Sequence, residues 1–205
     1  MPPGTKKKPL RSYHHGDLKE ALVEAAAAIV RTKGLDALTL REVARRTGVS
    51  PAAPYRHFPD RRALVAAVAE RGFARMQEAM VEGMKSGDGR AGFKQVALAY
   101  VSFGLTNPAE YRVMFGPEMA DTRDFPSLRE TARGVLGGTA EAVSQLQKAG
   151  LIGPGEPWLI AVALWSTLHG LVMLMLDGQT EGVAPDSDAL VEEVTRIMMF
   201  GMAPR

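Results

Sequence analysis

Hydrophobic positions along most of the chain recur every three or four residues, the spacing of one face of an α-helix. Leu18, Leu22, Ala25 and Ile29 form such a stripe between residues 17 and 33. The same spacing predicts helices over residues 61–85, 91–106, 108–115, 127–149, 158–176 and 189–202. No segment shows the two-residue period of a strand. The pattern therefore predicts an all-α protein.

A short segment near the N-terminus predicts two helices joined by a tight turn. Thr39 and Glu42 have the spacing of a capping box, so we expect a helix to begin at Thr39. Gly48 follows the last apolar turn of that helix, and Ser50 and Pro51 suit the start of a second one. This pattern is typical of a helix-turn-helix, whose second helix enters the major groove of DNA. The apolar residues expected to form its core are Leu18, Leu22, Ile29, Leu38, Leu40, Val43, Val49 and Phe58.

The charge of the chain divides unevenly. Residues 1–75 contain 15 Lys and Arg against 7 Asp and Glu, whereas residues 76–205 contain 10 against 16. A basic N-terminal part that coincides with a helix-turn-helix favours DNA binding over a merely solvated surface. We expect four segments: a flexible basic arm at residues 1–12, a helix-turn-helix domain at 13–60, a linking helix at 61–85 and a ligand-binding and dimerisation domain at 86–205. The arm either follows DNA or serves only as a solubilising tail.

Residues 158–176 contain no charged side chain. This length could span a membrane. Flanking Lys and Arg are missing, and His169 and Gly170 interrupt the segment, so we favour a soluble helix buried on all sides. The basic and polar N-terminus and the absence of cysteine are consistent with a cytoplasmic protein.

The N-terminal part of the chain resembles the tetracycline-repressor (TetR) family of bacterial regulators. The resemblance covers Tyr13 to about Arg75 and is carried by His15-Gly-Asp-Leu, Gly34-Leu-Asp-Ala-Leu-Thr-Leu-Arg-Glu-Val-Ala, Gly48-Val-Ser and Tyr55-Arg-His-Phe-Pro-Asp. Trp165, His169 and Gly170 are similar to the signature of a family branch with a Trp-His-Gly C-terminal domain. Pro54 departs from the family pattern, and it removes one backbone donor from the second helix.

The resemblance implies a homodimeric DNA-binding regulator, and we expect a repressor that a small apolar or amphipathic ligand releases from a near-palindromic operator. The last two long helices would form the dimer interface. Phosphates would be held by Thr39, Arg41, Tyr55, His57, Arg61 and Arg62, and Ala52, Ala53 and Arg56 would lie nearest the base edges. Ser50 is expected at the same DNA-binding surface.

A set of aromatic, methionine and histidine residues in the C-terminal part could line an apolar ligand cavity. The set consists of Tyr100, Phe103, Tyr111, Met114, Phe115, Trp165, His169 and Met173. Trp165 and His169 lie four residues apart and hence on one helix face, which suits either a pocket or ordinary packing.

Enzyme chemistry is not indicated. The sequence contains no nucleophile elbow, zinc-binding His-Glu-x-x-His motif or Rossmann fingerprint. His14 and His15 have no accompanying cluster of metal ligands, so we expect neither a metal nor a cofactor. The alternatives are a transcriptional activator or a ligand-independent DNA-binding protein and, more remotely, a helical enzyme or a membrane-associated helical protein.

Overall fold

The computed structural model describes residues 15–85, 87, 89–184 and 186–201, and this part of the chain folds into eight α-helices and contains no strand. The helices are α1 (His15–Lys33), α2 (Leu40–Thr47), α3 (Arg61–Lys85), α4 (Gly89–Thr106), α5 (Pro108–Phe115), α6 (Pro126–Lys148), α7 (Pro157–Leu176) and α8 (Ser187–Gly201). Single 3₁₀ turns are η1 (Leu35–Ala37), η2 (Pro54–Arg56) and η3 (Pro117–Met119). The all-α prediction is confirmed. The expected basic arm, residues 1–12, lies outside the described residues.

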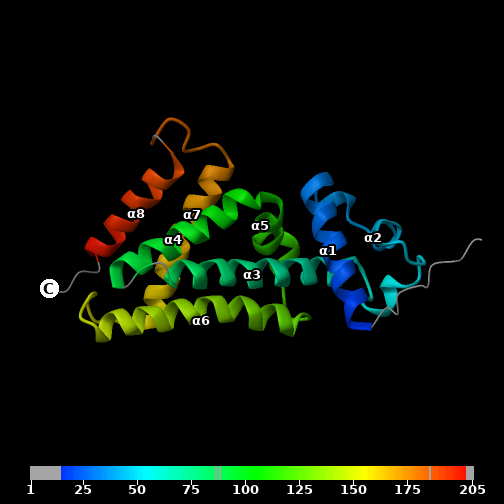
Figure 1. The fold of residues 1–205 in the computed structure, drawn as a ribbon, viewed down its shortest axis with the longest axis horizontal. Helices are drawn as coiled ribbons and strands as arrows, with labels where there is room; N and C mark the ends of the chain where they lie inside the picture. The colour runs from blue at the N-terminus through cyan, green and yellow to red at the C-terminus, as the bar shows by residue number, and fades with distance from the viewer. Residues whose placement is uncertain (1–14, 86, 88, 185, 202–205) are drawn as a thin grey trace, which may run out of the picture.

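Helix α3 is the axis of the molecule (Figure 1). Its N-terminal end lies beside α1, and its remaining length is flanked by α4 and α6. Helix α5 contacts both α1 and α3, so it lies where the N-terminal helices meet the rest of the chain. This arrangement makes α3 and α5 the main structural links between the two regions.

The N-terminal helices enclose the predicted core. Leu22, Ile29, Leu38, Val43 and Phe58 are almost completely buried, and Leu40 is buried as well. Leu18 and Val49 are partly buried against the same cluster. Burying a large aliphatic side chain contributes about 1.5–3 kcal/mol, so these residues stabilise the helix-turn-helix region.

Both ends of α2 follow from local sequence signals. The hydroxyl of Thr39 accepts a hydrogen bond from the backbone N–H of Glu42 at 3.1 Å, and Gly48 adopts the left-handed conformation with φ 70°. The reciprocal half of a capping box is not formed, because the Glu42 carboxylate instead accepts hydrogen bonds from Arg45 at 2.8 Å and Lys33 at 2.9 Å. The hydrogen bonds from Arg45 and then Lys33 lower the pKa of Glu42 to about 2.

The prediction of a regular second helix beginning at Pro51 is wrong. Residues 51–53 form turns, and only η2 follows, with hydrogen bonds such as Ala53 N–H to Ser50 C=O (3.0 Å) and His57 N–H to Pro54 C=O (3.0 Å). In an α-helix the C=O of Ser50 would accept from the N–H of residue 54, but proline has none. The carbonyl is satisfied one residue earlier, which gives the tighter 3₁₀ geometry.

The segment between α5 and α6, residues 116–125, is joined to α3 by side-chain contacts. It contains η3, and Met119 within it is buried. Arg61 donates to Glu118 at 2.8 Å, and Arg62 donates to Asp124 at 2.9 Å. The guanidinium of Arg62 also lies 4.9 Å from the ring centre of Phe125.

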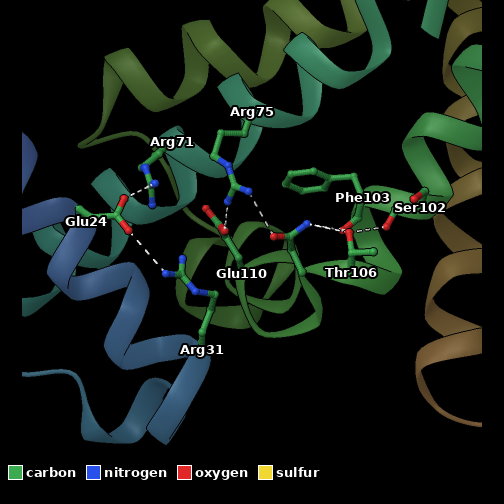
Figure 2. Close-up of polar contacts among 9 residues, drawn as sticks. Glu24, Arg31, Arg71, Arg75, Ser102, Phe103, Thr106 and Glu110 are labelled. Atoms are coloured by element: carbon green, nitrogen blue, oxygen red, sulfur yellow. Dashed lines mark hydrogen bonds and ion pairs between the residues drawn. The ribbon is translucent and has the colours of Figure 1, made fainter. Parts of the chain in front are cut away.

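Ion pairs join α1 to α3, and α3 to α5 (Figure 2). Glu24 of α1 pairs with Arg71 of α3 and lies 3.5 Å from Arg31. One turn further along α3, Arg75 donates to Glu110 of α5 at 2.6 Å. The Glu110 side chain is only 1% exposed, and its second carboxylate oxygen has no hydrogen-bond partner in the structure. This buried charge depends on Arg75 for compensation.

Helix α7 buries only one of its faces. Ala161, Leu164, Leu168, Leu171 and Val172 are buried and follow helical spacing. The prediction that this helix is buried on all sides is therefore wrong for the single chain. Its opposite face is open and apolar; the side chains concerned include Leu159, which is 71% exposed, Val162 and Leu174. By length and composition α7 could cross a membrane, but one side of it packs against α4 and α6.

Candidate DNA-binding surface and ligand cavity

The residues that follow α2 present polar and cationic groups to solvent. Pro54 is buried, and the 3₁₀ turn that it begins directs Tyr55 and Arg56 outward; Tyr55 is 51% exposed. Of the other residues predicted to contact DNA in this segment, Ser50 and Ala52 are exposed, and Ala53 and His57 are half-buried. The tight turn thus keeps the predicted set on one short exposed segment.

Helix α2 adds three further cations to this end of the molecule. Arg41, predicted from the sequence, is exposed, as is Thr39 at the helix start. Arg46 of the same helix is a further exposed arginine that is not among the DNA contacts predicted from the sequence. Arg45 is engaged by Glu42, whereas Arg41 and Arg46 form no ion pair within the described part of the chain. Unpaired arginines are suited to phosphate binding because the guanidinium presents several donors in one plane.

The two arginines at the start of α3 are placed differently. Arg61 donates to the backbone carbonyls of Leu38 and Leu35, each at 2.9 Å, as well as to Glu118. Arg62 donates to the backbone carbonyl of Asp121 and to the carboxylate of Asp124. Both guanidiniums are therefore occupied by contacts within the chain, and in this conformation they are not available to a phosphate.

A cavity of about 560 Å³ opens in the C-terminal region. Four of the eight residues that the sequence indicated line it: Tyr100, Met114, Phe115 and Trp165. The other four do not. Phe103 lies beneath the Arg75 guanidinium, 5.7 Å from it, Met173 packs against the core, and Tyr111 and His169 are linked by a hydrogen bond.

Hydrogen bonds connect four polar aromatic side chains beside the cavity. The indole N–H of Trp165 donates to the Tyr100 hydroxyl at 3.1 Å, and the hydroxyls of Tyr100 and Tyr111 lie 2.8 Å apart. The Tyr111 hydroxyl is 2.7 Å from Nδ1 of His169. One consistent set of donors runs from Trp165 through Tyr100 and Tyr111 to an unprotonated Nδ1, which would place the ring proton of neutral His169 on Nε2.

Burial keeps this network uncharged. It raises the pKa of Tyr100 to about 12 and raises that of Tyr111 further, and it lowers the pKa of His169. The network satisfies groups that would otherwise be buried without partners, so His169 acts here in packing rather than in lining the cavity. Trp165 does both, because its ring lines the cavity while its N–H is held by Tyr100.

Most of the cavity wall comes from residues that the sequence did not indicate. They include Phe73, Met76 and Met80 of α3, Phe93, Val96 and Ala97 of α4, Leu128, Arg129, Ala132, Arg133, Val135, Leu136 and Thr139 of α6, and Trp158, Leu164 and Leu168 of α7, together with Met119 and Thr122. The methionines of α3 recur at four-residue spacing, a signal that marks a helix face but does not distinguish a cavity wall from a filled core.

Two sequence families match the chain. Residues 22–68 match the family described as bacterial regulatory proteins, tetR family, and residues 93–198 match the tetracyclin repressor-like C-terminal domain. The second match spans about half of the chain, and the first includes the whole of α2 and η2.

Individual proteins agree with these matches. An uncharacterised HTH-type transcriptional regulator of Mycobacterium tuberculosis is 27% identical over 190 residues, 91% of this chain and 82% of that protein. A solved structure of a Rhodococcus protein of unknown function is 36% identical, covers 95% of this chain and all of the other, and superposes with a TM-score of 0.84. A TetR family transcription regulator from Marinobacter aquaeolei, 23% identical, shares the fold with a TM-score of 0.65 over 91% of this chain and 96% of its own.

Proposed function

Because the chain belongs to the TetR family of bacterial regulatory proteins, and is therefore a DNA-binding transcriptional regulator and not an enzyme, we propose that it is a repressor released from its operator by a small apolar or amphipathic ligand. Members of this family are cytoplasmic proteins that bind DNA operators and typically act as homodimers with small-molecule ligands. We propose the same arrangement for this chain, with DNA bound by the N-terminal helices and the ligand bound in the C-terminal region.

The proposed DNA contacts come from the exposed surface around α2 and η2. Arg56 with Ala52 and Ala53 would lie nearest the base edges, because these residues form the exposed turn where a recognition helix enters the major groove. Tyr55 and Arg41 would hold phosphates, and the unpaired Arg46 extends this set. Contacts to phosphate are independent of sequence and weaken with salt, whereas contacts to base edges discriminate between sequences.

The proposed dimer uses the open face of α7. Leu159, Val162 and Leu174 of α7 and Ile197 of α8 are exposed apolar side chains. Exposed apolar surface of this kind marks an interaction site, and a two-fold interface would cover it with the same face of a second copy. Two copies would then place two η2 turns in successive major grooves of a near-palindromic operator.

The observation that carries ligand control is the position of α5. Met114 and Phe115 of this eight-residue helix line the cavity, and Glu110, one turn earlier, pairs with Arg75 of α3. Helix α5 also contacts α1. A ligand that displaces Met114 or Phe115 therefore acts on an element that is joined to the N-terminal helices. It can shift the DNA-binding equilibrium only by its difference in affinity for the two arrangements.

The test is an anisotropy titration of labelled DNA from immediately upstream of the gene, at two salt concentrations and with excess nonspecific DNA. We expect competitor-resistant binding with two subunits per site, and weaker binding at higher salt. Binding no tighter than to random DNA would contradict the choice of operator or the docking of η2.

A reporter gene placed behind the bound DNA separates the repressor from an activator. Deletion of the regulator should raise expression of the reporter if the chain represses, and lower it if the chain activates. If none of the compounds that fill the cavity releases the DNA, the result would favour a ligand-independent regulator.

A further inference from the structure

Charged side chains lie at only one part of the cavity wall. The wall is apolar except for the hydroxyls of Tyr100, Thr122 and Thr139, the indole N–H groups of Trp158 and Trp165, and two arginines, Arg129 and Arg133. Among the described residues that line the cavity there is no Asp or Glu. The Tyr100 hydroxyl and the indole N–H of Trp165 are already bonded to each other. The arginines are therefore the main polar groups offered to a bound molecule.

Arg129 and Arg133 lie four residues apart on α6, so their side chains share one face of the helix. Like charges at this spacing repel each other unless an anion lies between them. Neither forms an ion pair among the described residues, whereas Arg112, Arg123 and Arg196 in the same region each pair with an Asp or Glu. Two arginines without an ion pair therefore share one face of α6, in a region whose net charge is negative.

The surroundings of the two arginines leave their donors free. The Arg133 guanidinium lies 5.5 Å from the ring centre of Trp158, which also lines the cavity, and stacking of this kind leaves its N–H groups available. Asp121 is close enough to Arg129 for that charge to help lower the pKa of Asp121, which falls to about 2 mainly through hydrogen bonds from Arg123. The Asp121 carboxylate is thus already engaged, at 2.7 Å from Arg123.

The cavity continues away from these arginines along α3, α4 and α6. A second cavity of about 330 Å³ shares Met80, Phe93, Val96, Val135 and Thr139 with the first and is almost wholly apolar. The cation at its wall, Lys85, pairs with Glu82 at 3.0 Å. Positive charge without a partner is therefore concentrated at one end of a long apolar space.

We propose that the cavity binds an amphipathic anion: an extended hydrocarbon tail lies along α3, α4 and α6, and a carboxylate or phosphate head group is held by Arg129 and Arg133. This assignment rests on the proposed function only in taking the cavity to be the ligand site of the regulator. Bidentate contacts to a planar or tetrahedral anion are what guanidinium groups make best.

The chain supplies its own reporter for this test. Its two tryptophans, Trp158 and Trp165, both line the cavity. Purified full-length protein, without DNA, is titrated with dodecanoate, dodecyl phosphate, 1-dodecanol and dodecyltrimethylammonium below their micelle concentrations, while tryptophan emission is recorded. We expect at least one of the two anions to bind saturably, and on the order of tenfold more tightly than the cation.

The double variant Arg129→Gln/Arg133→Gln identifies the head-group site. It should weaken binding of the preferred anion on the order of tenfold or more while leaving the affinity for 1-dodecanol unchanged. Lys148→Gln removes a positive charge from the same helix outside the cavity and should leave both affinities unchanged. Preference for dodecanoate over dodecyl phosphate, or the reverse, then distinguishes a carboxylate ligand from a phosphate ligand.

The proposal is overturned if neither anion binds saturably, if the cation binds as tightly as the anions, or if the double variant binds the preferred anion like the unaltered protein. A parallel DNA titration separates this result from the proposed regulation. If the anion binds as expected but does not release DNA, ligand-released repression is contradicted and the ligand class stands. If DNA is bound specifically but the anions are not, the DNA-binding assignment stands and the ligand class fails.

Discussion

The side chains proposed to contact DNA from α2 and η2 lie between Thr39 and His57, whereas the cavity is lined by five helices between Phe73 and Leu168. The first set rests on short-range signals: a cap, a left-handed glycine and a proline-led turn. The second depends on how distant helices pack. The arginines show the same contrast, since Arg41, Arg46 and Arg56 are exposed without an ion pair in the described chain, whereas Arg75 is committed to a buried carboxylate. A surface that binds DNA requires positive side chains without a partner in the chain, whereas a buried contact between two regions requires each charged side chain to be paired.

The largest expected effect is on stability, through the buried ion pair that joins α3 to α5. Arg75→Ala should lower the free energy of unfolding by about 3 kcal/mol, because it leaves the buried Glu110 carboxylate without its partner. Glu118→Ala removes the partner of Arg61 from an ion pair in which both side chains are partly exposed. It should lower the free energy of unfolding by less than about 1 kcal/mol. Urea unfolding monitored by circular dichroism measures both. Equal losses in the two variants would contradict the distinction between a buried and a surface pair.

The next effect contrasts a free arginine with an engaged one. Arg56→Ala should weaken operator binding by about tenfold to a hundredfold and reduce discrimination against altered operators, as loss of a base contact does. Arg62→Ala should leave the salt dependence of DNA binding unchanged, because its guanidinium is bound to Asp124 and Asp121. Anisotropy titrations at several salt concentrations test both. A flatter salt dependence in Arg62→Ala would restore this residue as a phosphate contact.

A smaller effect concerns pH and the hydrogen-bonded aromatic network. Burial lowers the pKa of His169 below 6.5, so the unfolded chain takes up its proton first as the pH falls. The stability that comes from neutral His169 is fully present above pH 6.5 and is lost as the pH falls toward the lower pKa of the folded protein. His169→Asn preserves an acceptor for Tyr111 but does not titrate.

The thermal midpoint should accordingly fall less between pH 7 and pH 5 in His169→Asn than in the unaltered protein. His57→Asn, outside this network, serves as the control and should keep the original pH dependence. If His169→Asn shows the same decline as the unaltered protein, titration of His169 does not account for it.

The smallest effect is confined to the turn before α3. Pro54→Ala restores a backbone N–H that can bond to the C=O of Ser50, so residues 51–57 should become more helical, with a change in stability within about 1 kcal/mol. Backbone carbon chemical shifts of this segment report the change. Shifts that stay as in the unaltered protein would show that packing around Phe58, rather than the missing donor, sets the 3₁₀ geometry.

Much of the fold could be predicted because helical periods and caps are local. The bounds of α3 and α5 agree with prediction, and Thr39 and Gly48 terminate α2 as expected. The segment after α2 differs from the predicted second helix because Pro54 lacks the backbone donor that an α-helix needs at that position. Which face of α7 is buried within the chain could not be predicted, because a continuous apolar segment has no polar stripe to show which side is covered.

The sequence by itself determined the all-α class, the position of the helix-turn-helix and the resemblance to the family, because each depends on residues within a few turns of one another. Only the tertiary structure decided which aromatic side chains line the cavity, that Tyr111 and His169 are used in a hydrogen-bonded network, and that Arg61 and Arg62 are engaged at the junction. Spacing along a helix specifies which residues share a face. What that face meets depends on partners many residues away, such as Glu118 for Arg61 and Glu110 for Arg75.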